Sequence, residues 1–154
     1  MAHEHHFAAK LVWTGAAQGP TKDYESYSRE FRIEIEGKPP LSGSADPTFR
    51  GDPGKHNPED LLVASLSACH LLSYLHLCAS AGIEVVAYED QASGRMAIKD
   101  RRMRFTEVTL APKVTISAGD LEQARTLHEK AHAACFIANS VNFPVLNMPT
   151  VTRA

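Results

Sequence analysis

Apolar residues dominate one long stretch of the chain, and polar residues punctuate the segments on both sides of it. From Leu61 to Ile83 the sequence contains no charged residue. Just before this stretch, Asn57 suits a helix N-cap and Pro58 suits the first helical position. Gly82 provides a stop signal. The pattern predicts a helix that begins at Pro58 and is about 24 residues, or about 36 Å, long.

A helix that is apolar nearly all round either crosses a membrane or is buried in protein. The Ser and His residues within it, the lack of a flanking Lys or Arg cluster and the polar segments elsewhere favour burial in protein. We therefore expect no membrane association. One small sheet is too narrow to cover such a helix on every side, so a second copy of the chain is expected to cover the rest. The helix predicts an obligate homodimer.

Strand patterns occur on both sides of this helix. Residues 7–14 and 27–36 are predicted strands, and in the second of these apolar and charged residues alternate, as in a half-buried antiparallel strand. Residues 41–59 are rich in Gly, Pro, Ser and Asp and are expected to form a loop. Residues 83–98 and 104–117 are predicted to form a second antiparallel pair.

The C-terminal third adds a shorter helix and a strand. Residues 120–134 have helical spacing of apolar positions and a capping box at their start, so they predict an amphipathic helix. Pro112 suggests that the predicted strand 104–117 is an edge strand or contains a bulge. Residues 141–154 are predicted to return as an edge strand. This order of elements predicts an α+β fold. With no internal repeat or linker, the chain is expected to be a single domain over residues 1–154.

Composition narrows the classes of partner. The formal net charge of -2 gives no electrostatic footprint for nucleic acid or an anionic membrane. The N-terminus lacks the basic region and apolar stretch of a signal peptide, so we expect a cytoplasmic protein. Three cysteines without Cys-x-x-Cys spacing argue against a disulfide framework or a zinc site. The histidines at positions 3, 5 and 6 are not expected to form a functional metal site, and no cofactor is expected.

Position in the sequence alone does not show which of the three cysteines is reactive and which is a core residue. Cys69 and Cys78 lie in the long apolar helix, where a core thiol is the default interpretation, especially for Cys78. Cys135 lies at the end of the second helix. Two stretches, HNPEDLLVASLSACH (56–70) and AHAACFIANSVNFPV (131–145), together resemble the OsmC/Ohr family of osmotically inducible and organic hydroperoxide resistance proteins.

The resemblance implies a fold and an activity. The fold is an intertwined homodimer in which long central helices pack between two antiparallel sheets. The activity is that of a thiol-dependent peroxidase, which reduces organic hydroperoxides in defence against oxidative stress and is regenerated by a dithiol such as a lipoyl group. The family pattern is an Asn-Pro-Glu helix start, a cysteine ten residues after the Glu and a second cysteine in the following helical region. These positions are Glu59, Cys69 and Cys135.

The resemblance also assigns roles. Cys69 matches the peroxidatic cysteine, Cys135 the resolving cysteine and Glu59 the active-site glutamate. The family pairs an arginine with that glutamate, and Arg50 is the matching position, with Arg29 as the second choice. The second cysteine is often followed by proline in the family, whereas Phe136 follows it here, and Cys78 is not part of the pattern.

The chemistry agrees with these roles. A peroxidatic cysteine must be a thiolate, and a thiol in apolar surroundings needs a nearby cation to ionise. A guanidinium such as that of Arg50 remains charged and can bind sulfur and peroxide oxygen together, and Glu59 would orient it. Ten residues of helix place Glu59 and Cys69 about 15 Å apart, on different faces. Antiparallel helices crossing near residue 64 would bring Glu59 of one subunit beside Cys69 of the other, giving two composite sites per dimer.

Two other classes remain open. One is a cysteine hydrolase in which His70 or His76 activates Cys69, although neighbouring helical residues point about 100° apart, which makes His70 a poor base. The other is a non-catalytic dimer that binds an apolar ligand. In either peroxidase or binding protein, an apolar pocket is expected. Four apolar residues are suggested as its lining, namely Phe49, Leu66, Phe136 and Phe143.

Overall fold

The alternating segments near the N-terminus form a three-stranded antiparallel sheet. In this computed structural model, which describes residues 3–154, the strands are β1 (Lys10–Val12), β2 (Phe31–Glu34) and β3 (Leu41–Gly43), in the order β1-β2-β3. The first two lie within the predicted strands. β3 and a short 3-10 helix, Pro47–Phe49, lie in the segment that was expected to be a loop. The rest of the segment up to Asn57 is a loop, as expected, and a strand of three residues is too short to show an alternating pattern.

The chain divides into two units. One ends at Leu61 and the other comprises Leu62–Ala154. Helix α1 (Pro58–Ser80) begins in the first unit and continues through the second. The single domain expected for residues 1–154 therefore stays a prediction.

Helix α1 has the predicted ends. The Asn57 side chain accepts a hydrogen bond from the backbone N–H of Asp60 at 2.8 Å, and the Asp60 carboxylate accepts one from the N–H of Asn57 at 3.4 Å. This reciprocal pair is a capping box. At the other end, Gly82 has a φ of +71°, which favours glycine, and the N–H of Ile83 donates to the carbonyl of Cys78 at 2.9 Å. The predicted start at Pro58 and stop at Gly82 are confirmed.

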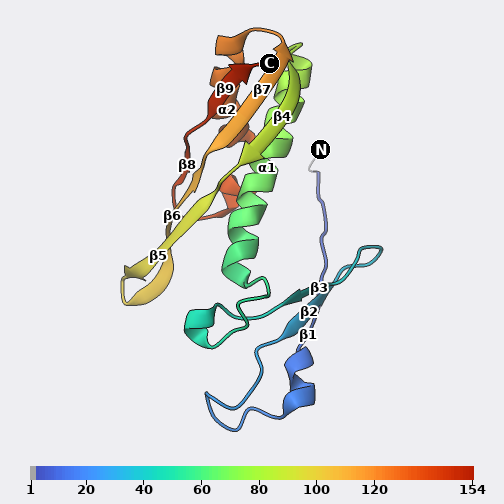
Figure 1. Cartoon of the computed structure of the whole chain (residues 1–154), viewed down its shortest axis with the longest axis vertical. Helices are drawn as coiled ribbons and strands as arrows, with labels where there is room; N and C mark the ends of the chain where they lie inside the picture. The colour runs from blue at the N-terminus through green and yellow to red at the C-terminus, as the bar shows by residue number, and fades with distance from the viewer. Residues whose placement is uncertain (1–2) are drawn as a thin grey trace. The chain divides into compact units, whose positions relative to one another are not determined.

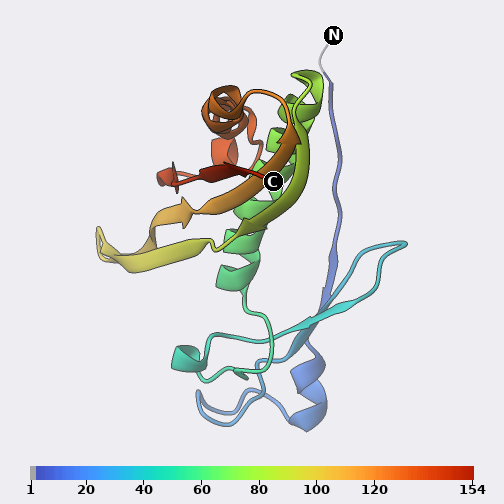
Figure 2. The same ribbon diagram turned by 45° about the horizontal axis from the view of Figure 1, so that its top comes forward.

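Six strands of the second unit form two further sheets (Figures 1 and 2). In spatial order they are β4 (Glu84–Asp90), β7 (Pro112–Ala118) and β9 (Thr150–Arg153) in one sheet, and β5 (Ser93–Lys99), β6 (Arg102–Leu110) and β8 (Val145–Asn147) in the other. β4 pairs antiparallel with β7, and β5 pairs antiparallel with β6. β8 and β9 add parallel to β6 and β7. Both lie at sheet edges, so the C-terminal segment forms two short edge strands in place of the single one predicted.

Each strand of the predicted second pair is broken once, and the carboxylate of Asp90 explains where. Asp90 accepts hydrogen bonds from the backbone N–H of Ala111 at 2.7 Å and from the hydroxyl of Ser67 at 2.5 Å. A side chain thus replaces a backbone partner at the point where β6 ends. Pro112, which has no N–H to donate, is the first residue of β7. The pair therefore becomes four strands divided between two sheets.

Helix α2 (Leu121–Ala134) begins as predicted, because the Asp120 side chain accepts a hydrogen bond from the N–H of Gln123 at 2.6 Å. Side chains of both helices pack with β7 and β9 in the largest hydrophobic core. Its buried members are Tyr74, Cys78, Ile83, Val114, Ile116, Ala124, Leu127, Ala131 and Val151. The predicted α+β fold is confirmed.

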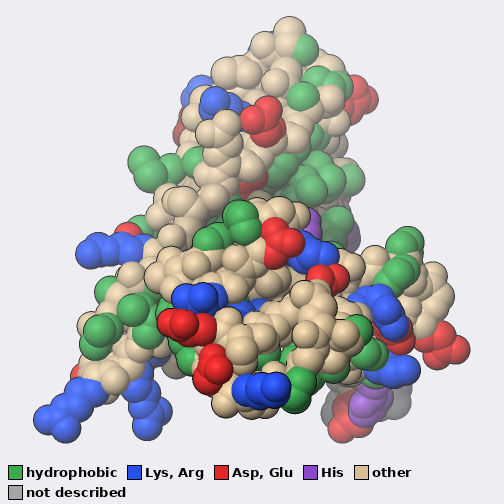
Figure 3. Space-filling view, turned by 60° about the horizontal axis from the view of Figure 1, so that its bottom comes forward, with side chains coloured by type: hydrophobic (Ala, Val, Ile, Leu, Met, Phe, Trp, Pro, Cys, Tyr) green, Lys and Arg blue, Asp and Glu red, His purple; other side chains and the backbone are tan. Residues whose placement is uncertain are grey.

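Only one stripe of α1 is buried. The residues are Leu66, His70, Tyr74 and Cys78, four positions apart, as on one face of a helix. By length and composition α1 could cross a membrane, and 22% of its most apolar window is buried within the described residues. Leu72 is 67% exposed, and other apolar side chains are also exposed on the face drawn in Figure 3. The second copy that would cover this surface stays a prediction.

Candidate functional site

Two free thiols lie side by side in the second unit. Cys69 lies on α1 and is partly buried, whereas Cys135 follows the last residue of α2 and is 1% exposed. The two thiols are near enough for Cys69 to influence the pKa of Cys135. The fold thus brings together the two cysteines that the family pattern selected, although they are far apart in the sequence. Their catalytic roles stay predictions.

Burial controls the ionisation of Cys135. It raises the pKa of this thiol, and the neighbouring Cys69 acts in the same direction. The backbone N–H of Ala138, 3.4 Å from Sγ, lowers the pKa but does not outweigh burial. Cys135 is therefore held as a neutral thiol near neutral pH.

The third cysteine is a core residue. Cys78 is 1% exposed and belongs to the same hydrophobic core as Tyr74. Burial raises the pKa of the Cys78 thiol, as it does for any thiol without a nearby cation. The interpretation of Cys78 as a core thiol is confirmed.

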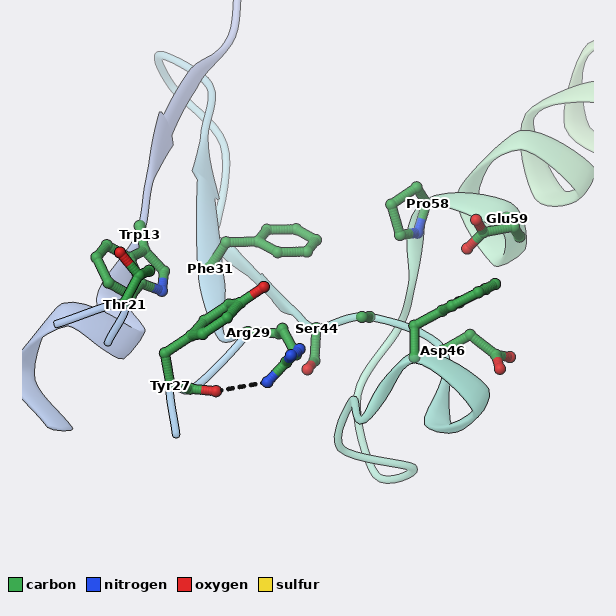
Figure 4. Close-up of a pocket in the computed structure, with 11 residues that line it drawn as sticks. Trp13, Thr21, Tyr27, Arg29, Phe31, Ser44, Asp46, Pro58 and Glu59 are labelled. Atoms are coloured by element: carbon green, nitrogen blue, oxygen red, sulfur yellow. Dashed lines mark hydrogen bonds between the residues drawn. The ribbon is translucent and has the colours of Figure 1, made fainter. Parts of the chain in front are cut away.

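A pocket of about 550 Å³ lies in the N-terminal unit (Figure 4). Aromatic side chains form much of its wall, and Arg29 and Glu59 enter it from the segment before β2 and from the first turn of α1. The full lining is Trp13, Thr21, Tyr27, Arg29, Phe31, Ser44, Ala45, Asp46, Phe49, Pro58 and Glu59. Such a pocket suits an apolar ligand that carries one polar group.

The guanidinium of Arg29 is held by backbone carbonyls and aromatic rings. It donates hydrogen bonds to the carbonyls of Tyr27, at 2.7 Å, and of Tyr24. Its central carbon lies 3.9 Å from the centroid of the Tyr27 ring and 4.8 Å from that of Tyr24, which are cation–π contacts. Within residues 3–154 it forms no ion pair. Its positive charge is therefore positioned without being neutralised by a carboxylate.

Arg50 is placed differently. It has a φ of +64° at the end of the short 3-10 helix, and its side chain is 49% exposed. Its only carboxylate partner within the described residues is Glu25, at 3.9 Å, and that side chain is 76% exposed. An exposed pair of this kind contributes little. The first choice for the arginine does not line the pocket with Glu59, whereas the second choice, Arg29, does.

Glu59 is free for the pocket because its neighbour completes the helix cap. Asp60 and Asn57 exchange the two capping hydrogen bonds. Glu59 then lies in the first turn of α1, where the positive end of the helix dipole favours a carboxylate. No hydrogen bond or ion pair of its side chain occurs among the described residues.

Of the four residues suggested as a pocket lining, Phe49 lines this pocket and the other three do not. Leu66 is 0% exposed and belongs to a hydrophobic core with Val108, against which Phe143 also packs. Phe136 is 81% exposed. An apolar residue near a motif fits a core, a pocket or a surface equally well by sequence, so the role of these three as lining of the substrate pocket stays a prediction.

Two histidines that the family pattern does not include form a buried pair between α1 and α2. His70 Nε2 lies 3.0 Å from His128 Nδ1, and the rings are 1% and 2% exposed. The ring of Tyr74 stacks on that of His128 with centroids 3.9 Å apart. Burial lowers the pKa of both histidines, that of His128 to about 4.

This pair weakens the hydrolase interpretation. The Nε2 of His70 is engaged with His128, and the ring is buried. His70 is therefore unsuited to act as a base for Cys69. The sequence motifs give His128 no role and give His70 no role beyond that of a poor base. The available signal was a histidine in the buried stripe of each helix.

Metal ligands are not clustered in the part of the chain that the structure describes. No group of three His, Cys, Asp or Glu side chains within residues 3–154 could hold a metal ion. His3, His5 and His6 lie in the exposed N-terminal segment.

Comparisons with known proteins agree with the fold and the motif. A family model described as OsmC-like protein matches residues 51–147. Comparison with curated proteins gives no match. Among solved structures, an OsmC-like protein of unknown function from Vibrio cholerae is similar at 30% identity and a TM-score of 0.87, covering 96% of this chain and 100% of that chain.

Two more distant structures share the fold. An organic hydroperoxide resistance protein from Elizabethkingia anophelis has 20% identity and a TM-score of 0.71, covering 100% of both chains. Another from Legionella pneumophila has 18% identity and a TM-score of 0.68, covering 98% of this chain and 99% of that chain. At these identities the likeness concerns the fold.

The buried histidine pair predicts acid-sensitive stability. The folded-state pKa of His128 is about 4, below its ordinary value of 6.5, so the unfolded chain binds more protons than the folded protein between these values. The free energy of unfolding should therefore fall as the pH is lowered through this range. In His128→Asn, we expect the fall to be smaller by about 3 kcal/mol, measured by urea denaturation at a series of pH values. An unchanged pH dependence in the variant would contradict this origin.

Proposed function

Since this chain belongs to the OsmC-like protein family, we propose that it is a thiol-dependent peroxidase that reduces organic hydroperoxides to alcohols in defence against oxidative stress. The observation that carries this proposal is the adjacency of two free thiols, the partly buried Cys69 and the buried Cys135. Solved relatives named organic hydroperoxide resistance proteins share the fold and support the substrate class.

In the first step, the Cys69 thiolate attacks the terminal oxygen of the hydroperoxide. The O–O bond breaks, the alkoxide takes up a proton and leaves as an alcohol, and Cys69 becomes a sulfenic acid. A cation near the sulfur favours the thiolate, and hydrogen-bond donors stabilise the alkoxide as it forms. A guanidinium offers both functions.

In the second step, Cys135 resolves the sulfenic acid. Its sulfur attacks that of Cys69, the hydroxyl leaves with the Cys135 proton as water, and a disulfide forms. Because burial raises the pKa of Cys135, this thiol retains its proton until the sulfenic acid is present. A dithiol reductant, for example a lipoyl group, then opens the disulfide and completes the cycle. The cycle requires no cofactor in the protein and suits the reducing cytoplasm.

We assign the arginine role to Arg29 in place of Arg50. Arg29 shares the pocket with Glu59 and carries a charge that no described carboxylate neutralises, whereas Arg50 lies in an exposed ion pair. Glu59, with no other partner, would orient the guanidinium when substrate binds. The aromatic wall of the pocket would hold the organic part of the hydroperoxide.

The proposed site is shared between two chains. Ten residues of unbroken α1, or about 15 Å, lie between Glu59 and Cys69. The apolar surface of α1 that this chain leaves exposed would be covered by a second copy. Antiparallel association of two α1 helices would then place Arg29 and Glu59 of one protomer beside the thiols of its partner.

A non-catalytic binding protein is the second candidate function. The pocket in the N-terminal unit is formed without either thiol, and its aromatic lining alone suits an apolar ligand. The two proposals differ at Cys135, because a binding protein needs no second thiol in reach of the first.

The peroxidase proposal predicts a specific disulfide. Fully reduced protein treated with one equivalent of cumene hydroperoxide should form a Cys69–Cys135 link, detected by peptide mass spectrometry. Cys69→Ser should abolish dithiol-dependent turnover, and Cys135→Ser should accumulate a sulfenic or over-oxidised Cys69 because resolution is blocked. Cys78→Ser is the matched control and should retain turnover. A reduced Cys69 after treatment would favour the binding protein.

The assignment of the arginine can be tested with two matched variants. Arg29→Ala should lower the rate of Cys69 oxidation by about 10²-fold, because it removes the cation and the donors to the peroxide. Arg50→Ala should leave the rate within about twofold of the wild type, since it removes only an exposed ion pair. Stopped-flow measurement of the reaction with cumene hydroperoxide distinguishes them. The reverse order of effects would return the role to Arg50.

Sharing of the site between protomers predicts complementation. Cys69→Ser retains Arg29 and Glu59, whereas Arg29→Ala retains both thiols, and each variant alone should show little turnover. After mixed refolding, half of the dimers should be mixed and have one complete site of two, so turnover should recover to about one quarter of wild type. Refolding each variant alone is the control. No recovery in the mixture would mean that each site lies within one chain.

A further inference from the structure

The buried His70–His128 pair has no part in the proposed reaction, yet each histidine lies on the same helical segment as one of the thiols. His70 directly follows Cys69 in α1, and His128 precedes Cys135 by two turns at the end of α2. The contact between the two imidazoles, 3.0 Å from nitrogen to nitrogen, is therefore close in sequence to both reacting groups.

Two directional contacts join α1 to α2. The first is the imidazole pair. The second is the hydroxyl of Tyr74, one turn after His70, which donates to the carbonyl of Ala124 in α2 at 2.8 Å. The Tyr74 ring also stacks on His128. Because these groups are fully buried, water does not compete for the hydrogen bonds, and the spacing of the helices is fixed at this point.

The protonation state of the pair determines whether the contact survives. Within residues 3–154 the outer nitrogens, His70 Nδ1 and His128 Nε2, have no hydrogen-bond partner. In the neutral pair, one ring donates its proton to the other. A first added proton preserves this bond, because a doubly protonated ring still faces a lone pair. A second proton leaves two N–H groups and two positive charges 3.0 Å apart, which breaks the contact.

Other titratable groups bias this equilibrium. Asp90 in β4 favours the charged form of His70, and His132 in α2 opposes it. Tyr74 is buried and Tyr88 is partly buried, and their rings are 6.1 Å apart. Both are neutral phenols near neutral pH because burial raises both pKa values. Burial of the histidine rings outweighs the effect of Asp90, so the pair is neutral near neutral pH.

We propose that His70 and His128 are positioning residues: their neutral, hydrogen-bonded pair holds α1 and α2 at the separation at which the two thiols meet. The inference deepens the proposed function and rests on it for the role of the disulfide in turnover. A disulfide requires the sulfur atoms to approach to about 2 Å, so a small change in helix spacing strongly affects its formation. A misplacement of about 1 Å can slow such a step by about 10²-fold.

Dipyridyl disulfide measures this positioning without a hydroperoxide. The accessible Cys69 thiolate attacks one sulfur of the reagent and releases one pyridine-2-thione in a first phase. The Cys135 thiolate then displaces the second pyridine-2-thione from Cys69, forming the protein disulfide in a second phase. The absorbance of the released thione follows both phases in the full-length protein. The first phase reports access to Cys69, and the second reports the approach of Cys135.

Three variants separate positioning from access. His128→Leu removes the hydrogen bond and should slow the second phase at least about tenfold while the first phase is unchanged. His70→Gln places an amide near the original Nε2, so it should retain the second-phase rate at neutral pH. Because glutamine does not titrate, the pair in this variant cannot become doubly charged. His76→Gln changes an exposed histidine of the same helix and should match the wild type. Circular dichroism verifies that each variant is folded.

The pH profile gives a readout that a merely structural role would not change. Loss of the Cys135 thiolate alone lowers the second-phase rate by about tenfold per pH unit. Below about pH 4 the wild type should fall more steeply than this, because the pair also becomes doubly charged. His70→Gln should follow the tenfold slope throughout.

The outcomes are distinct. A wild-type second phase in His128→Leu, or identical pH slopes in the wild type and His70→Gln, would overturn the inference. If His128→Leu does not fold, the comparison of slopes decides alone. A protein that behaves as expected here but does not turn over cumene hydroperoxide would refute the peroxidase proposal and leave the positioning pair standing.

Discussion

The contact between α1 and α2 determines where both thiols lie. Cys69 and Cys135 belong to different helices, so no local interaction sets their separation. Two buried hydrogen bonds, a stacked ring and a shared apolar core do so instead. Cys135 is itself buried, and burial raises the pKa of its thiol, so its place in the fold also determines its protonation.

Joining two helices through an imidazole pair lowers the free energy of unfolding relative to an apolar contact. Each ring has one nitrogen without a partner among the described residues, and a buried unsatisfied group costs about 1–3 kcal/mol. Two apolar side chains of similar volume would avoid that cost. They would not define a distance as sharply, because dispersion contacts tolerate sliding, whereas a hydrogen bond between two ring nitrogens does not. The choice of His70 and His128 is understandable if spacing matters more here than stability.

Much of the fold follows from local signals in the sequence. The cap at Asn57 and the stop at Gly82 define α1, and Asp120 defines the start of α2, because each signal acts on the adjacent backbone. The breaks in the strands did not follow, since the carboxylate of Asp90 reaches the backbone of Ala111 only after folding. β3 is likewise too short to carry a pattern. Side chains that satisfy a distant backbone group leave no periodic trace in a sequence.

In the candidate site, too, local features are predictable from the sequence and features that depend on folding are not. The spacing of Glu59 and Cys69 on one helix is a local property and is predictable, whereas the choice between Arg29 and Arg50 depends on how two loops pack. The length and the apolar character of α1 both bear on this site. A helix that places a carboxylate and a thiol about 15 Å apart leaves each half of the proposed site incomplete, and its exposed apolar surface gives a reason for two chains to associate. In the proposed dimer the cation would meet the thiol only after assembly, so Arg29 in one chain would be one half of the proposed site.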